Sequence, residues 1–144
     1  MNCIYKLDLT TWRWSKLHPT GTRPLQSCGS ASWVSGDNIF LFGGFGDLEL
    51  FSETWYPESL KIDGMVSNQL VYYNCQENSW NWPITSGTAP SPSSGAAAFS
   101  VSDWYMDPTR GEERFRSFAF VFGGWCDTTD EVHSEVLGDL HTSE

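Results

Sequence analysis

The hydrophobic residues of this chain fall into short runs of strand length, separated by glycine, proline and polar residues. Two of these runs, 39–42 and 118–122, are apolar throughout and end at a pair of glycines. Because they lack the apolar–polar alternation of a half-buried strand, we expect both strands to be covered on both faces. Frequent, scattered glycine and proline are typical of short strands joined by turns, so the pattern predicts an all-β fold.

These runs belong to an internal repeat. The segment 39–45 recurs as 118–125, and the segment 7–14 matches 73–80, in which an apolar residue precedes a Trp by seven positions. After each Trp comes a Thr-Gly or Ser-Gly turn with a Pro, and then a segment of small residues. A pattern that runs through almost twice predicts stacked units that bury one another's surfaces.

The complete middle unit contains four strand-like segments, at about 28–34, 38–43, 69–75 and 79–84. Two further stretches, about 49–68 and 103–116, are longer than the repeat requires. Asp-Pro and Arg-Gly are turn signals within the second stretch, so we expect it to be a surface loop between two strands.

The glycine pairs, the aromatic residue and the Trp seven positions after it resemble the kelch repeat. The residues that carry this signature are Gly43, Gly44, Trp14, Tyr73, Trp80, Gly123 and Gly124. The resemblance implies an all-β fold, a partial kelch β-propeller with four-stranded antiparallel blades that is incomplete at both ends. Within the family, the segments 12–17 and 82–92 are similar to kelch domain-containing proteins that serve as substrate receptors of cullin-RING ubiquitin ligases.

The repeat divides the chain into three parts. Residues 1–27 correspond to the end of one blade and an inter-blade turn. Residues 28–94 correspond to a second blade with an insertion at about 49–68, and residues 95–144 to the start of a third blade with an insertion at about 103–116. Because propellers have about four to eight blades, we expect a fragment of a longer protein or a truncated gene product. In isolation, we expect it to associate through its open edges.

In a propeller, the large apolar residues of the repeat pack between neighbouring blades. Paired glycines let the chain turn at positive φ and let bulky groups approach the backbone. A large aromatic side chain covers roughly 150–250 Å² of surface. We therefore expect Trp14, Trp80, Phe42 and Phe122 to lie in the core.

The composition agrees with a folded, acidic protein. Hydrophobic residues make up 40% of the 144 residues and aromatic residues 15%, more than disordered chains contain. The formal net charge of −10 repels phosphate backbones, which argues against nucleic acid as a partner, and the apolar runs are too short to span a membrane. The four cysteines are far apart in the sequence, which favours a reducing compartment and hence a cytoplasmic or nuclear location.

The sequence contains no recognisable pattern of catalytic, cofactor-binding or metal-binding residues. His18, His133 and His141 are not paired at metal-ligand spacing with another His or a Cys. Nucleophile-elbow, zinc-protease and phosphate-loop motifs are absent. Galactose-oxidase-type enzymes share the kelch fold, but they bind copper through Tyr and His side chains. The spacing of the three His residues in this sequence gives no support for such a copper site. We therefore expect a non-enzyme without cofactor or metal, because function must be argued from a site.

The resemblance also implies how a partner is bound. Ligase-type kelch receptors hold the C-terminal carboxylate of a protein with Arg and Ser side chains, through charge-assisted hydrogen bonds. Here Ser52, with Trp55 beside it, occupies the place of a pocket-lining Ser, and Arg23 lies in an inter-blade turn. Turn capping, packing or simple solvation would explain these three residues equally well. Where the family has an Arg and a His after the turn, this chain has Gln26, Ser93, Gly29 and Ala96.

The insertion at 103–116 offers a second candidate contact. Trp104 and Tyr105, followed by Met106, are residue types enriched at protein interfaces, and long loops on rigid scaffolds often carry function. A simple surface loop remains the alternative.

Together these observations predict a protein-binding kelch module. The specific hypothesis is substrate recognition for a ubiquitin ligase, with proteins or peptide C-termini as partners and cullin-RING components engaged through regions outside this sequence. The alternatives are a general kelch scaffold for cytoskeletal or signalling proteins, or a truncated non-functional fragment.

Overall fold

The computed structural model describes residues 3–47, 55–127, 134–136 and 140–143. In these residues the chain forms β-strands and no helix, which confirms the all-β expectation. The strands are β1 (Ile4–Asp8), β2 (Arg13–Leu17), β3 (Thr20–Gly21), β4 (Ala31–Ser35), β5 (Asn38–Phe42), β6 (Ile62–Asp63), β7 (Val66–Ser67), β8 (Leu70–Asn74), β9 (Ser79–Asn81), β10 (Ala97–Met106), β11 (Glu113–Phe122), β12 (Trp125–Asp127), β13 (Ser134–Val136) and β14 (Leu140–Ser143). None of the described segments is thus a helix of the length and hydropathy that crossing a membrane requires.

The middle of the molecule is a sheet with the strand order β3-β9-β8-β5-β4. The strands β4, β5, β8 and β9 pair antiparallel, as the repeat predicts, and we call them the middle unit. The short strand β3 adds a parallel edge by pairing Thr20 with Ser79. Gly21, at φ +80°, allows this contact, because a Cβ there would overlap the carbonyl of Trp80.

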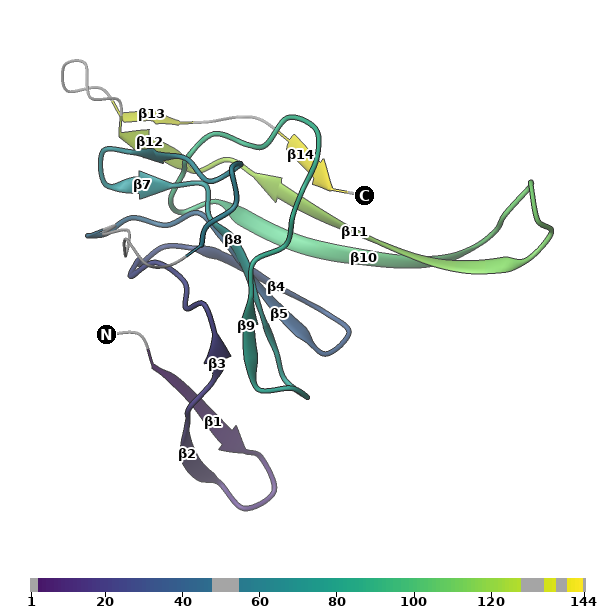
Figure 1. Ribbon diagram of the computed structural model, residues 1–144, viewed down its shortest axis with the longest axis horizontal. Coiled ribbons are helices and arrows are strands. Elements are labelled where there is room, and N and C mark those ends of the chain that lie inside the picture. Colours follow the sequence, from purple (N-terminus) through teal and green to yellow (C-terminus); the bar gives the residue numbers. More distant parts are fainter. Residues whose placement is uncertain (1–2, 48–54, 128–133, 137–139, 144) are drawn as a thin grey trace.

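Two further sheets repeat parts of the middle unit (Figure 1). The first unit is the hairpin β1–β2, which pairs Leu7 with Trp14 just as β8 and β9 pair Tyr73 with Trp80. The last unit consists of β10, β11 and β14, and its strand β14 pairs with β11 as β8 pairs with β5. The sequence repeat is therefore also a repeat of strand pairing.

The glycine pairs adopt the same backbone conformation in both copies. The φ angles are 69° and 113° at Gly43 and Gly44, and 71° and 100° at Gly123 and Gly124. These left-handed values favour glycine and turn the chain out of β5 and β11. Short two-stranded sheets follow each pair, β6–β7 after the first and β12–β13 after the second.

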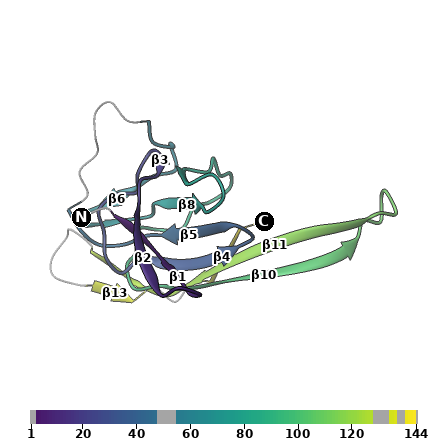
Figure 2. The same ribbon diagram turned by 90° about the horizontal axis from the view of Figure 1, so that it is seen from below.

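The hairpin β10–β11 is the most extended part of the molecule and projects far beyond the other sheets in both views (Figure 1 and Figure 2). Its outer end consists of residues 103–116, which we expected to be a surface loop. The pairing of the two strands continues to Met106 and Glu113, so only the tip at 107–112 is a turn. Alternating cross-strand pairs continue the ladder through this segment.

Two hydrophobic clusters cover the two faces of β5. Phe42 and Phe40 face a cluster that contains Trp33 of β4 and Val121 of β11. Leu41, which points the other way, packs against a cluster of Leu25, Val71 and Trp82. The expectation that β5 is covered on both faces is met at these positions.

The expected core positions behave differently in the three units. Phe42 is only 4% exposed and Trp80 is half-buried, as expected for core residues. Trp14 and Phe122 are 67% and 51% exposed, so their assignment to the core is wrong in this structure. The reason is that β2 pairs only with β1, and that no described sheet packs against the Phe122 side of β11.

Candidate functional site

Backbone hydrogen bonds at equivalent positions close one end of the middle unit and of the last unit. Cys28 and Phe45 exchange two N–H···O=C bonds of 2.8 and 2.9 Å, and Ser94 and Trp125 exchange two bonds of 2.9 Å. Cys28 and Ser94 each stand before the small-residue strand of their unit, and Phe45 and Trp125 each follow a glycine pair. These reciprocal bonds fix the ends of the units that carry the glycine turns.

A buried amide that the sequence did not reveal holds the same region together. Gln69 is 1% exposed, accepts a bond from the N–H of Leu25 at 2.9 Å, and donates to the carbonyl of Gly43 and the hydroxyl of Ser27, both at 3.0 Å. Because buried polar groups are costly unless paired, Gln69 links the inter-unit turn to the glycine pair. Its place at the start of an apolar strand gave no signal of this role.

The neighbouring Asn68 positions a surface groove. Its side-chain amide donates to the carbonyls of Ser59 and Pro90 at 3.1 and 3.0 Å, and its oxygen accepts from the N–H of Lys61 at 2.5 Å. These bonds tie the segment before β6 to the segment between β9 and β10. The two segments thereby form two walls of the groove.

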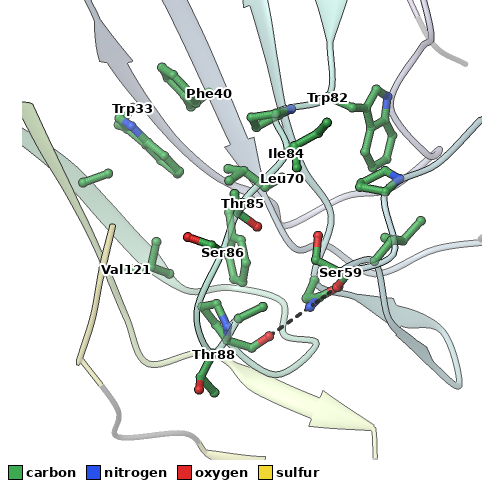
Figure 3. Close-up of a pocket in the computed structure, with 18 of the residues that line it drawn as sticks. Trp33, Phe40, Ser59, Leu70, Trp82, Ile84, Thr85, Ser86, Thr88 and Val121 are labelled. Atoms are coloured by element: carbon green, nitrogen blue, oxygen red, sulfur yellow. Dashed lines mark hydrogen bonds between the residues drawn. The ribbon is translucent and has the colours of Figure 1, made fainter. Parts of the chain in front are cut away.

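The groove has a volume of about 670 Å³ and lies between the middle and last units. Figure 3 shows Trp33 and Phe40 at one side, Trp82 at the other, and Ile84, Thr85 and Ser86 between them. Trp33 and Phe40 are stacked, with ring centroids 5.2 Å apart. Among the described residues, its lining contains aromatic, aliphatic and hydroxyl side chains and the amide of Asn68, but no Asp, Glu, Lys, Arg or His. The groove therefore suits an uncharged, largely apolar segment.

The tip of the β10–β11 hairpin carries exposed apolar side chains on one face. Trp104 and Phe115 stand directly opposite each other, with ring centroids 5.2 Å apart, and are 65% and 56% exposed. Met106 lies two residues further along the same strand, and so on the same face, and is 59% exposed. Three large apolar side chains thus gather at the end of a projecting hairpin.

The opposite face of the tip is polar. Arg116 lies 3.4 Å from the carboxylate of Asp103 and over the ring of Tyr105, at 4.7 Å from its centroid. Arg114 lies 3.5 Å from Asp107. Hydrogen bonds from the hydroxyl and N–H of Thr109 lower the pKa of Asp107 below its ordinary value. Exposed ion pairs of this kind contribute little stability, so this face differs from the other mainly in its charge.

The predicted binding residues do not form one site. Trp104 and Tyr105 are adjacent on β10 and point to opposite faces of the hairpin. Arg23 is exposed and Trp55 is 59% exposed, and neither lines the groove. Ser52 lies outside the described residues. A carboxylate-binding role for Arg23, Ser52 and Trp55 stays a prediction.

Metal ligands do not gather in the part of the chain that the structure describes. No group of three His, Cys, Asp or Glu side chains there is arranged to hold a metal ion. No disulfide bond joins Cys3, Cys28, Cys75 and Cys126 to one another.

Comparison with known proteins agrees with the repeat and its geometry. Residues 1–142 match the family model of the KLHDC2/KLHL20/DRC7 Kelch-repeats domain. The chain is 44% identical over 57 residues, 38% of its length, to Kelch domain-containing protein 2 of Bos taurus. It is 27% identical over 133 residues, 87% of its length, to host cell factor 2 of Homo sapiens. It is also 28% identical over 102 residues, 71% of its length, to the Rho GTPase-activating protein gacHH of Dictyostelium discoideum.

These relatives are much longer than the chain, which covers 14%, 15% and 6% of their respective lengths. The family match nevertheless extends over nearly all of the sequence. Three structural features correspond to the sequence match: the stacked antiparallel units, the paired glycines at positive φ, and the cross-strand pair of Tyr73 and Trp80. The chain belongs to the KLHDC2/KLHL20/DRC7 Kelch-repeats family.

Proposed function

We propose that this chain is a protein-recognition module and that it selects substrates for a cullin-RING ubiquitin ligase. The observation that supports recognition most is the exposed apolar face of Trp104, Met106 and Phe115 at the hairpin tip. Aromatic residues and Met are the types enriched at interface centres, and a cluster of exposed apolar side chains is a common mark of a binding surface.

The hairpin suits this role because it is ordered before binding. Ten cross-strand pairs, from Ala97–Phe122 to Met106–Glu113, hold β10 and β11 together. Trp104 and Phe115 already pack on each other, so a partner does not have to immobilise either side chain from a free state. A contact surface that is ordered in advance loses less entropy on association.

The groove between the units provides a second contact in this proposal. Its volume of about 670 Å³ lies within the range of roughly 300–1,000 Å³ typical of ligand sites. Because its lining bears no charge, an apolar stretch of the substrate fits it better than a terminal carboxylate does. Recognition of a C-terminus would require Arg23, Ser52 and Trp55 instead.

The ligase assignment rests on the resemblance to kelch domain-containing receptors, and we place the segment that recruits the cullin outside these 144 residues. A general scaffold for signalling proteins is the second candidate. It is favoured by the similarity to a Rho GTPase-activating protein and to host cell factor 2, which both extend over more of the chain than the similarity to Kelch domain-containing protein 2 does. Either role is consistent with a cytoplasmic or nuclear protein.

The test uses the full-length product of the gene, purified from cells as wild type and as the double variant Trp104→Ser/Phe115→Ser. We expect a cullin to co-purify with both forms, and ubiquitinated substrates to be lost from the variant by at least tenfold. Leu9→Ser is the matched control, because Leu9 is 72% exposed and distant in sequence from the tip.

Absence of a cullin from the wild-type sample would reject the ligase role and favour the general scaffold. Undiminished substrate recovery with the double variant would instead reject the hairpin tip as the contact.

A further inference from the structure

The apolar face of the hairpin tip is exposed although the unit that packs on this side of the hairpin is present. Val121, on the same face of β11, packs against the rings of the middle unit. Near the outer end of this contact, the hydroxyl of Ser35, the last residue of β4, lies 3.0 Å from that of Ser117. The next pair on this face, Trp104 and Phe115, lies further out along the projecting hairpin (Figure 2). The exposure of this pair therefore follows from the length of the hairpin.

A carboxylate lies on the same face as these rings. Glu113 pairs with Met106 and stands two residues before Phe115 on β11, so its side chain is on the face of both. Glu113 is exposed. Asp103 and Asp107 each lie near an Arg of the hairpin, whereas Glu113 forms no ion pair with any Arg or Lys of the described residues. The apolar face of the tip thus carries a negative charge without a counter-charge.

The opposite face of the hairpin shows what a carboxylate and an aromatic ring can hold together. There Arg116 pairs across the strands with Asp103, which stands two residues before Tyr105. The guanidinium lies 3.4 Å from the Asp103 carboxylate, 4.7 Å from the ring centroid of Tyr105 and 5.2 Å from that of Phe118. A cation is attracted to the face of an aromatic ring as well as to a carboxylate, so the three kinds of group form one arrangement.

The apolar face repeats two parts of this arrangement and lacks the third. A carboxylate again stands two residues before an aromatic residue, at Glu113 and Phe115. Trp104, opposite Phe115, adds a second ring, with the two centroids 5.2 Å apart. The residue paired with the carboxylate, however, is Met106 and not an arginine. The face therefore offers the groups that hold a guanidinium on the other side of the hairpin, while the paired position supplies no cation.

We propose that the apolar face of the tip binds an arginine side chain of the partner, with the guanidinium in contact with the Glu113 carboxylate and the rings of Trp104 and Phe115. This inference rests on the proposed function, in which the same face contacts the substrate. It names the chemistry of that substrate as an exposed segment in which an arginine stands next to apolar residues. A guanidinium suits the site better than the ammonium of lysine, because it is planar, weakly hydrated and stacks on aromatic faces.

The charge of the whole molecule favours the same kind of partner. With a formal net charge of −10, the chain attracts positively charged segments over a long range. Added salt screens both this attraction and the contact with the exposed Glu113. Binding of an arginine-containing segment should therefore weaken as salt is raised, whereas binding of an uncharged analogue should change little.

The test compares the binding of two synthetic peptides to the full chain by NMR. One is acetyl-Leu-Arg-Leu-amide, and in the other citrulline replaces the arginine, which keeps the shape of the side chain and removes its charge. We expect both peptides to shift the indole N–H resonance of Trp104. The arginine peptide should bind about fivefold more tightly, as an exposed cation–π contact predicts. A lysine peptide should bind more weakly than the arginine peptide.

Glu113→Gln is the decisive variant. It should lower the affinity for the arginine peptide by about threefold, the size expected for an exposed ion pair, and leave the affinity for the citrulline peptide unchanged. Glu112→Gln is the matched control, because Glu112 is also exposed and its replacement changes the net charge equally, but it lies in the turn between β10 and β11. This control should bind both peptides as the wild type does.

Equal affinities of the wild type for the arginine and citrulline peptides, no shift of Trp104 with either, or equal effects of the two Gln variants would overturn the proposal. A lysine peptide that binds as tightly as the arginine peptide would overturn the assignment to arginine.

Substrate recovery with the full-length protein separates this inference from the proposed function. If Trp104→Ser/Phe115→Ser loses the substrates while Glu113→Gln recovers them in full, the tip is the contact and the arginine site is wrong. If the double variant also recovers them in full, the tip is not the contact and both proposals fail.

Discussion

At the scale of single residues, the turns that connect paired strands show the repeat most clearly. The carboxylate of Asp8 accepts hydrogen bonds from the N–H groups of Thr10 and Thr11 at 2.8 and 2.9 Å. At the equivalent turn, the Oδ1 of Asn74 accepts from Gln76 and Glu77 at 3.0 and 2.8 Å. The only two non-glycine residues with positive φ in the described chain, Trp12 and Asn78, also occupy equivalent places, at 56° and 52°.

The first prediction concerns the charge of Asp8. The hydrogen bonds from Thr11 and Thr10 lower the pKa of Asp8 below its ordinary value of 3.8. Because the pKa is lowered in the folded chain, the hydrogen bonds contribute their full stability at pH values above the ordinary pKa of 3.8. This stability is lost as the pH falls through the folded-state pKa. We expect the amide resonances of Thr10 and Thr11 to titrate with a midpoint below 3.8, and Asp8→Asn to keep the turn and abolish the titration, because Asn74 makes the same bonds.

The measurement is an NMR titration of both proteins from about pH 6 to about pH 2, a range that brackets the ordinary pKa of a carboxyl group. A midpoint at or above the ordinary value in the wild type, or an unfolded turn in Asp8→Asn, contradicts the assignment.

Gln69 illustrates what single-residue patterns do not reveal. A polar residue at the start of an apolar strand is most simply interpreted as exposed, and the sequence gives no sign of its three buried bonds. The partners of Gln69 come from the inter-unit turn and the glycine pair, which only the folded chain brings near. Buried polar networks of this kind are therefore visible in structure and not in periodicity.

At the scale of elements, the periodic pattern predicted the strands of the middle unit to within a few residues. It was less informative about 103–116, where turn signals located the bend but not the ladder that leads to it. Asp103 to Met106 and Glu113 to Arg116 pair residue by residue, and the tip is closed by bonds between Asp107 and Glu112 and between Gly111 and Asp107. Whether flanking residues pair depends on the partner strand, which a local pattern does not contain.

The second prediction concerns the turn after β5. Gly43 has φ +69°, and a Cβ there would overlap the backbone carbonyl of Ser93, which lies in the connection from β9 to β10. Gly43→Ala should therefore lower the free energy of unfolding by about 2–4 kcal/mol, from backbone strain and forced displacement together. Gly36→Ala is the control, because Gly36 has φ +57° but open space around it, and should cost only about 1 kcal/mol.

Urea denaturation at a single low protein concentration compares the two variants with the wild type. Equal losses in the two variants would mean that the approach of Ser93 to Gly43 contributes nothing to stability.

At the scale of the whole molecule, the order of units followed from the sequence, but the burial of repeat positions did not. Trp14 and Trp80 hold the same place in the pattern, yet Trp14 is exposed and Trp80 is half-buried. Phe42 and Phe122 differ in the same way. In a stacked architecture a residue is buried by the next unit, so identical motifs acquire different environments according to their neighbours.

The central claim is that two kelch units stack through Val121 of the last unit and the aromatic rings of the middle unit. The most direct measurement is a methyl-resolved NOESY spectrum of the full chain. We predict NOEs from the Val121 methyl groups to the Trp33 or Phe42 ring, across a long separation in sequence. A folded chain that shows the strand pairings of each unit but no NOE between Val121 and either ring would contradict the account.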